Sequence, residues 1–341
     1  MRLLLLIVFI PVFSYAQKSG NDTMVVYLAP NLEFTAKNNA AFYGLAMKEG
    51  DHWLVYAIYP DTTPVLRAYY KDKTLKVKDG PYTVYYAKNK KAKDGYYHNN
   101  KRYSVWRDWY ENGQLRDSGR FNNDRMEGEW KSYYNNGALQ VICNFGKPDD
   151  EDFSYDGGIT VREVDYPTEI NMNQSSRNGK YTSWYMNGNR EAEGKFTNNQ
   201  FDGEWKWYYD NGKPSTIEQY KKGILSDLSC FDSTGMYTGV VCSVVRPALL
   251  KHYGNYRQFI YDNLLWPEEA IKQKLKGNVH ISFKVTKEGQ LKDFSMVGGH
   301  QVFRKAVSEL FEKMKEWEPA VSHNRPIETE EEMDIPFYRK F

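Results

Sequence analysis

The sequence lacks most of the features that reveal catalysis, metal binding or membrane insertion. It has three Cys and six His in 341 residues, and no Cys or His pair stands at the spacing of a zinc site. The short motifs of zinc proteases, serine hydrolases and phosphate-binding loops are absent. The net charge of +2 selects neither nucleic acid nor an anionic membrane, and the mean hydropathy of −0.74 excludes a polytopic membrane protein. We therefore expect no enzyme, no cofactor, no metal ion and no nucleic-acid partner.

One apolar run stands at the start of the chain. Arg2 gives a positive start, residues 3–13 are apolar, and Ser14-Tyr15-Ala16 offers small residues at the two positions that a signal peptidase reads. We interpret residues 1–16 as a signal peptide, with Gln17 as the first residue of a periplasmic or secreted protein that has no integral membrane span. The alternative is an uncleaved inner-membrane anchor, but about 11 apolar residues are fewer than the roughly 20 that a spanning helix needs.

An exported chain meets an oxidising compartment, in which cysteines can pair. Cys230 and Cys242 flank a turn-rich stretch at residues 232–235, and a disulfide between them would close it. This pairing would leave Cys143 as the odd cysteine. The alternative, that all three are small buried apolar residues, stays open.

Aromatic residues are in excess, above all 28 Tyr and 9 Trp, and much of the excess lies in a repeat with a period of 24 residues. In each copy a short aromatic stretch leads into an Asn-Gly pair, which is the strongest local hairpin signal when both residues adopt positive φ. A single hairpin cannot bury its own face, so stacked hairpins predict a single-layer β-ribbon over residues 78–228. The copies are residues 104–113, 128–137, 179–188 and 203–212, with a degenerate copy at 80–86.

The pattern G-x-W/Y-x-x-W/Y-Y-x-N-G resembles the MORN-repeat superfamily, in the variant of exported and antitoxin-like bacterial proteins. The resemblance covers residues 78–225 and implies a scaffold or contact module without shared catalytic residues. The aromatic face of this ribbon consists of Trp106, Trp130, Tyr181 and Trp205. Cross-strand packing already explains these positions, and a stacking platform for a glycan or peptide is the less favoured alternative.

The segments on either side of the repeats are assigned from their patterning. Residues 17–77 carry short strands over 25–28, 41–47 and 52–59, which we expect to continue the ribbon and cap its end. Residues 229–252 are expected to be a linker. After about residue 245 the Asn-Gly turns vanish and a helical period appears.

The last ninety residues predict a small α+β domain over 253–341. Helical segments start at Pro267 and Val302, alternating strands cover 278–286 and 290–297, and a last strand alternates through Met333, Ile335 and Phe337. The order α-β-β-α-β places helices against one antiparallel sheet.

This domain resembles the C-terminal domain of TonB, the energy transducer of Gram-negative envelopes. Trp266 stands where the family has Tyr, and Asn324 where it has Gly. The segments that carry the resemblance are Trp266-Pro267-Glu268-Glu269-Ala270, Lys276-Gly277-Asn278-Val279, Val285-Thr286-Lys287-Glu288-Gly289, Trp317-Glu318-Pro319-Ala320 and Asn324-Arg325-Pro326-Ile327.

The resemblance implies capture of an extended peptide of an outer-membrane transporter, added as a strand to the edge of the sheet. By position this edge is the last strand, with Met333, Ile335 and Phe337 toward the core and Asp334 and Tyr338 outward. The neighbouring acidic run, residues 328–332, can instead serve to prevent pairing at the edge, and the two readings are about equally favoured.

The sequence thus predicts a mainly β, non-catalytic protein of the cell envelope that binds other proteins. A complete transducer also needs a membrane helix and a long Pro-rich span, whereas the 13 Pro of this chain are unclustered. The leading hypothesis is an adaptor that contacts an outer-membrane transporter or another envelope protein through its C-terminal domain. The alternative is a surface-interaction or antitoxin/immunity-like protein in which the ribbon binds the partner.

The interpretation of residues 1–16 is tested by mass spectrometry of the N-terminus after cell fractionation. We expect a periplasmic or secreted protein that starts at Gln17, because the apolar run is too short to span a bilayer. Recovery of intact Met1 in the inner membrane would contradict cleavage and restore the anchored alternative.

Overall fold

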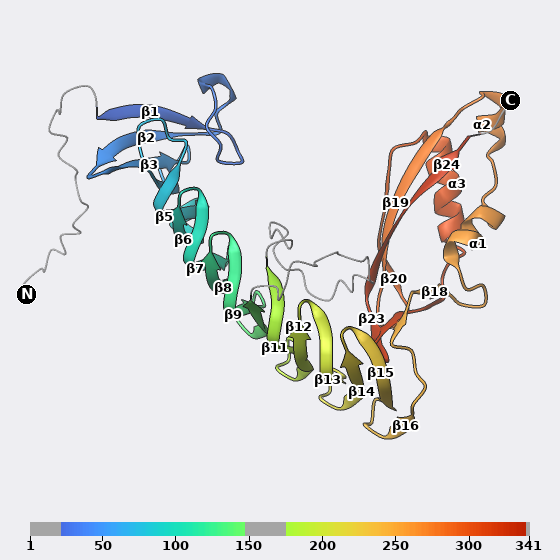
Figure 1. Cartoon of the computed structure of the whole chain (residues 1–341). Helices are drawn as coiled ribbons and strands as arrows, with labels where there is room; N and C mark the ends of the chain where they lie inside the picture. The colour runs from blue at the N-terminus through green and yellow to red at the C-terminus, as the bar shows by residue number, and fades with distance from the viewer. Residues whose placement is uncertain (1–21, 147–174, 339–341) are drawn as a thin grey trace, which may run out of the picture. The chain divides into compact units, whose positions relative to one another are not determined.

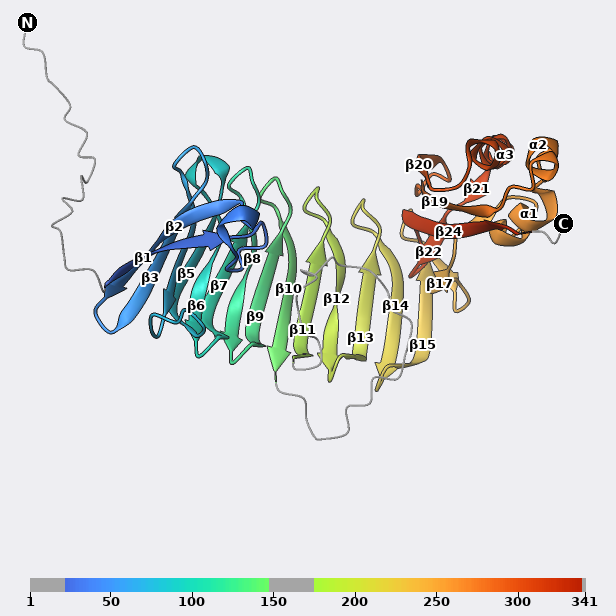
Figure 2. The ribbon, with the colours of Figure 1, turned by 90° about the horizontal axis from the view of Figure 1, so that it is seen from above.

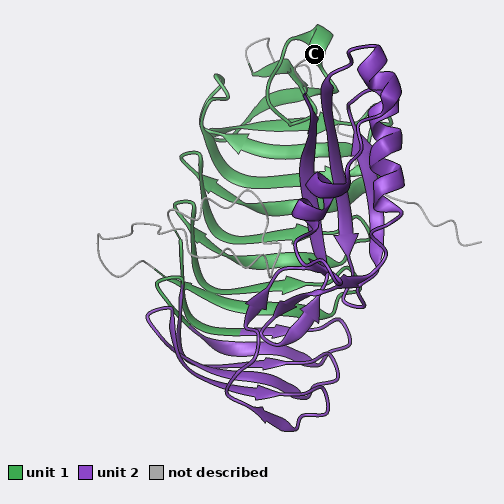
Figure 3. Cartoon of the chain, turned by 90° about the vertical axis from the view of Figure 1, so that its right-hand side faces the viewer, with its two compact units in different colours: residues 1–181, 196–199 green, residues 182–195, 200–341 purple. Residues whose placement is uncertain are grey.

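The computed structural model of the chain describes residues 22–146 and 175–338, and it is mainly β (Figure 1). The expected signal segment, residues 1–16, lies outside the described residues. Two compact units are present, one of residues 1–181 with 196–199 and one of residues 182–195 with 200–341 (Figure 3). A long antiparallel sheet and a small α+β region confirm the predicted fold class.

Strands β1 to β16 are hydrogen-bonded neighbours in their order along the chain, as a series of hairpins produces (Figure 2). The three strands expected before the repeats are present as β1 to β3. A fourth strand, β4, was not predicted; it begins at Pro64, a residue tolerated at the start of a strand. The strands are β1 (Thr23–Leu28), β2 (Phe42–Glu49), β3 (His52–Ile58), β4 (Pro64–Tyr70), β5 (Lys78–Tyr86), β6 (Lys90–His98), β7 (Lys101–Trp109), β8 (Leu115–Asn122), β9 (Arg125–Tyr133), β10 (Leu139–Gly146), β11 (Ser176–Trp184), β12 (Arg190–Thr197), β13 (Gln200–Tyr208), β14 (Pro214–Lys221), β15 (Ile224–Phe231) and β16 (Tyr237–Gly239).

The Asn-Gly turns differ from the two-residue type that the sequence suggested. The Tyr110 N–H donates to the Gln114 carbonyl (2.9 Å) and the Gly113 N–H to the Tyr110 carbonyl (2.8 Å), which closes a three-residue loop. Gly113 has a φ of 91°, whereas Asn112 is not among the residues with positive φ. Asn112 instead accepts the Gln114 N–H with its side chain at 2.9 Å. A type I turn followed by a glycine bulge has this pattern.

The two-residue turns with two positive φ values lie at the other ends of the hairpins. Asn123 and Asp124 have φ of 53° and 66°, and Asn198 and Asn199 have φ of 50° and 65°. Their side chains also join neighbouring hairpins, since the Asp124 carboxylate accepts the Arg102 N–H at 2.8 Å. Asn and Asp tolerate this conformation better than other non-glycine residues.

A tryptophan lying on a glycine of the preceding strand recurs within each unit. A Cβ added to Gly119 would lie 2.0 Å from the Trp130 ring, and one added to Gly194 would lie 2.2 Å from the Trp205 ring. In the same way the Trp106 ring lies over Gly95. Each indole N–H donates to the carbonyl ten residues upstream, at 3.2 Å for Trp106 and Trp130 and 2.9 Å for Trp205.

A tyrosine of each repeat ties its hairpin to the next one. The hydroxyl of Tyr110 donates to the carbonyl of Tyr133 (2.8 Å), and Tyr185 donates to the carbonyl of Tyr208 (2.7 Å). The bond recurs because the repeat length brings an equivalent carbonyl to the same place. The aromatic excess of the sequence is therefore used for packing and hydrogen bonding inside the sheet.

The C-terminal domain has the predicted α-β-β-α-β order, with additional short elements. Its main sheet has the strand order β20-β19-β24, and its core contains Phe283, Phe303, Val307 and Ile335. Figure 1 shows α3 beside this sheet. The elements are α1 (Tyr256–Asn263), α2 (Glu268–Lys272), β19 (Gly277–Val285), β20 (Leu291–Val297), α3 (Gln301–Phe311), β21 (Trp317–Glu318), β22 (Ala320–Ser322), β23 (Arg325–Ile327) and β24 (Thr329–Phe337).

Residues 229–252, expected as a linker, contribute strands instead. They contain the end of β15, all of β16, and the short strands β17 (Val245–Arg246) and β18 (Leu249–Leu250). β17 pairs with β22 and β18 pairs with β21. Strands of two residues are too short to leave an alternating pattern, which explains why the sequence did not predict them.

Replacement of a covered glycine tests the tryptophan–glycine contact. Gly119→Ala should lower the free energy of unfolding by about 2–3 kcal/mol, because the new methyl group overlaps the Trp130 ring. Gly146→Ala is the matched control, since its Cβ would make an ordinary 3.4 Å contact with Asn178. Urea unfolding of the full chain measures both, and equal losses would contradict the importance of the contact.

Candidate functional site

The last strand of the C-terminal sheet carries the residues that the sequence proposed for peptide binding. β24 pairs with β19 over nine residues, and in the described part of the chain no strand pairs with its other side. Met333, Ile335 and Phe337 are buried in the core, whereas Tyr338 and the side chain of Asp334 are each 65% exposed. The five side chains therefore alternate between core and solvent.

The two edges of this sheet differ. β20, the other edge strand, has a positive φ of 52° at Asp293, and its register against β19 shifts between Ser282 and Lys284. Such a bulge interrupts the row of backbone donors and acceptors that an added strand needs. β24 keeps an unbroken register against β19 from Thr329 to Phe337. The regular edge of the domain is therefore β24.

Alternate residues of β24 direct their backbone groups toward β19 and toward the open edge. The Thr286 N–H donates to the Gln290 carbonyl (2.9 Å) across the β19–β20 hairpin, so even-numbered residues of β19 face β20 and odd-numbered ones face β24. Odd residues pair with odd residues, as Ile281 does with Met333. The even-numbered residues of β24 therefore face outward, including Pro336, which has no N–H to give to a ladder.

The solvent face of the sheet is polar and charged. Asp334 lies 3.0 Å from the Nδ1 atom of His280, and the Lys284 ammonium lies 2.9 Å from the Asp293 carboxylate. A hydrogen bond from Lys284 holds the pKa of Asp293 below its usual range. These pairs are exposed, so they order the face without adding much stability.

The end of β24 is held by aromatic packing. Phe337 stacks on Phe303 of α3 with ring centroids 4.2 Å apart, and Trp266 lies against both rings at 5.7 and 5.9 Å. Trp266, which replaces the tyrosine of the family pattern, is partly buried and packs against the core of the domain. This packing fixes the strand that offers the open edge.

A second group of contacts, within the second unit, connects the last repeat to the β22–β23 turn. The two residues of this turn, His323 and Asn324, have φ of 47° and 62°. Asn324 thus adopts the left-handed conformation at the position where the family pattern has glycine. The His323 ring stacks on Trp207 at 3.5 Å and 10°. Its Nδ1 atom lies 2.8 Å from the Glu218 carboxylate, and both side chains are buried. Arg325 donates to the Tyr185 hydroxyl at 2.7 Å.

Glu218 stands 24 residues after Gly194, at the repeat position where a glycine receives the tryptophan of the following strand. β15 has no tryptophan, and His323 of the C-terminal domain supplies the ring at this position. Burial alone would raise the pKa of Glu218, but hydrogen bonds from His323, Thr216 and Tyr220 outweigh it and hold this pKa below its usual range. The carboxylate is therefore ionised at neutral pH. We call the contact of His323 with Glu218 and Trp207 the histidine latch.

The other predicted site residues lie in structural positions. Trp106, Trp130, Tyr181 and Trp205 are buried, so none of them presents an open ring face for a ligand. Cys230 and Cys242 form a disulfide, and Cys143 is buried. Glu218 and His323 were not predicted as site residues. Glu218 could have been noticed, because it stands where the repeat otherwise has glycine, but no pattern in the sequence indicates that His323 contacts it.

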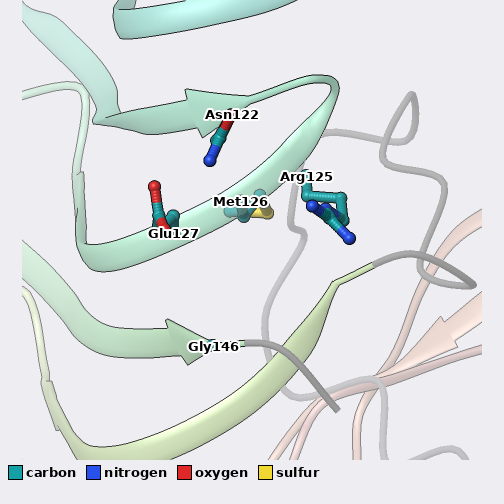
Figure 4. A pocket seen from close by; sticks show the side chains of 5 residues that line it. All are labelled: Asn122, Arg125, Met126, Glu127 and Gly146. Carbon is teal, nitrogen blue, oxygen red and sulfur yellow. The ribbon is translucent and has the colours of Figure 1, made fainter.

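Three further observations on residues 22–146 and 175–338 concern a pocket, metal binding and membrane insertion. A small hollow at the β8–β9 turn is lined by Asn122, Arg125, Met126, Glu127 and Gly146, and Figure 4 shows Arg125 pointing away from Glu127. Within the same residues, no group of three His, Cys, Asp or Glu side chains is placed to hold a metal ion. No helix of the described chain combines the length and the apolar character needed to cross a membrane.

Two family models match parts of the chain. Residues 262–338 match the family model described as Gram-negative bacterial TonB protein C-terminal. The C-terminal domain is similar to that of TonB. Residues 126–146 and 201–222 match the MORN repeat variant, so both resemblances are confirmed. No curated protein matches the chain.

These matches support a TonB-like protein-interaction role in the cell envelope. The matched C-terminal family is a non-catalytic protein-interaction domain. The polar, regular edge of β24 suits such a protein interaction better than it suits catalysis. It also points to protein partners in the envelope or periplasm.

The histidine latch should contribute to stability in a pH-dependent way. Because the pKa of Glu218 in the folded chain lies below its ordinary value of 4.5, its contribution is fully present above pH 4.5 and is lost as the pH falls through the folded-state pKa. In urea unfolding from pH 7 to pH 3, Glu218→Gln should lose less stability on acidification than the natural chain. Equal acid sensitivity of the two chains would contradict this assignment.

Removing the ring tests the same contact at neutral pH. His323→Ala should cost about 3 kcal/mol of unfolding free energy, because it removes one of the three side chains that hydrogen-bond the buried Glu218 carboxylate and leaves a cavity beside Trp207. His280→Ala breaks an exposed histidine–aspartate pair and should cost less than about 1 kcal/mol. Thermal unfolding of the full chain compares the two variants. Similar losses would mean that burial of the pair does not matter.

Proposed function

We propose that the protein is a periplasmic or secreted adaptor whose C-terminal domain captures an extended peptide of an outer-membrane transporter or another envelope partner. The peptide adds as a strand to β24. The observation that supports this most directly is the open edge, whose outward backbone groups belong to the even-numbered residues of a regular nine-residue strand. Main-chain hydrogen bonds would supply the affinity, and side chains beside Asp334 and Tyr338 the selectivity.

Each part of the chain has a different role in this proposal. Residues 1–16 direct export and are removed, residues 17–228 form a scaffold, and residues 253–341 bind the partner. The scaffold role is supported by the buried positions of Trp106, Trp130 and Trp205, which leave those rings no open surface.

A second candidate function places the partner on the ribbon, as in a surface-interaction or immunity-like protein. It is favoured by three exposed residues near the start of the ribbon, Val25, Tyr43 and Tyr56, which are 58%, 48% and 39% exposed. Tyr56→Ser should weaken binding only under this alternative.

The experiment uses proline at a position whose N–H faces the open edge. Peptides selected from a phage-displayed random library on the full chain are synthesised, and their affinities are measured by fluorescence anisotropy. Asp334→Pro should weaken binding about tenfold, because it removes an outward donor while the ladder to β19 stays intact.

Asp334→Ala is the matched control, since it removes the same side chain and keeps the N–H. It should change the affinity less than twofold. Binding that is equally strong in all three chains would overturn strand addition at β24. Loss of binding in Tyr56→Ser alone would indicate that the binding site lies on the ribbon and not on β24.

A further inference from the structure

The open edge of β24 is partly occupied by a side chain of α1. The Arg257 guanidinium donates from Nη2 to the carbonyl of Glu332 at 3.0 Å. Glu332 is even-numbered, so its carbonyl is one of the outward acceptors of the edge. The same Nη2 atom lies 3.9 Å from the Glu331 carboxylate.

The position of this guanidinium conflicts with an added strand. Neighbouring strands lie about 4.8 Å apart, and an added strand would use the outward Glu332 carbonyl as the acceptor for one of its own N–H groups, the place that Arg257 takes here. A peptide that pairs with the Asp334–Phe337 part of the edge avoids the guanidinium. A peptide that continues to Glu332 has to displace it.

Arg257 is held weakly enough to be displaced, whereas its helix is held firmly. The Arg257 side chain is 46% exposed, it has one hydrogen bond and one long ion pair with β24, and its guanidinium carbon lies 5.1 Å from the centre of the Tyr256 ring. The backbone below it is fixed by the cap of α1, because the Asn255 side chain accepts the N–H of Arg257 at 2.9 Å. Tyr256 is buried and donates its hydroxyl to Glu331 at 2.8 Å. The side chain can therefore move while α1 stays in place.

We propose that Arg257 is a built-in competitor at the peptide-binding edge, which confines strand addition to Asp334–Phe337 until a longer peptide displaces it. This inference rests on the proposed function, because it assumes that β24 is the binding edge. Arg257 lies on α1, before the segment that matches the TonB C-terminal family, which begins at residue 262. Its effect is on affinity and on the length of peptide bound.

The test compares peptide affinity with and without the competitor. Peptides are selected by phage display on the full-length Arg257→Ala chain, so that sequences able to use the whole edge are not excluded. The synthetic peptides are then titrated by fluorescence anisotropy against Arg257→Ala, Arg257→Met and the natural chain. We expect both variants to bind about five- to tenfold more tightly than the natural chain. Arg257→Met keeps an apolar stem of similar length and has no donors.

Two controls separate this inference from the proposed function. Arg304→Ala removes one positive charge from an exposed position on α3 and should leave affinity unchanged. Asp334→Pro, introduced into the Arg257→Ala chain, should weaken binding about tenfold.

Equal or weaker binding by Arg257→Ala together with a loss in Asp334→Pro would overturn the competitor and leave strand addition intact. No effect of Asp334→Pro would overturn strand addition itself. Tighter binding by Arg304→Ala as well would show a general charge effect and would also overturn the competitor.

Discussion

The contact on which the ribbon depends is a tryptophan ring lying against the backbone of a glycine on the preceding strand. A single layer of strands has no opposite sheet to bury its side chains, so each hairpin must bury them against its neighbour. Glycine makes this possible because the ring occupies the space in which a Cβ would stand, as at Gly119 and Gly194. The indole N–H then donates to a carbonyl of the adjacent strand, and the tyrosine hydroxyl to a carbonyl of the next hairpin, so the polar atoms of Trp130 and Tyr185 are not left unpaired.

The end of such an array poses a distinct physical problem, because the last repeat has no successor to cover it. In the second unit the solution combines two changes, Glu218 in place of the glycine and His323 in place of the tryptophan. A buried carboxylate is tolerated because several donors converge on it. The contact also orders the β22–β23 turn, a segment within the TonB-like match. The repeat array and the interaction domain thus share one buried contact.

The sequence was informative where contacts are local or periodic. The 24-residue repeat predicted the hairpins, and the alternation of Met333, Ile335 and Phe337 predicted which side of β24 is buried. The type of the Asn-Gly turns was predicted wrongly, because an Asn-Gly pair fits a two-residue and a three-residue loop equally. The register of the flanking strands decides between the two loops. Contacts between distant residues were not predicted either. Glu218 and His323 are 105 residues apart, and Arg257 and Glu332 are 75 apart, so no local pattern connects them.

The spacing of the tryptophan–glycine contacts has a consequence for how such a chain changes in length. Each contact joins two positions eleven residues apart, and each tyrosine bond reaches one repeat onward. Inserting or deleting one whole repeat keeps every contact of this kind and leaves the last repeat to meet His323 as before. An insertion of one residue inside a strand would instead turn the side chains beyond it to the wrong face. This array can therefore change its length by whole hairpins while the histidine latch at its end stays the same.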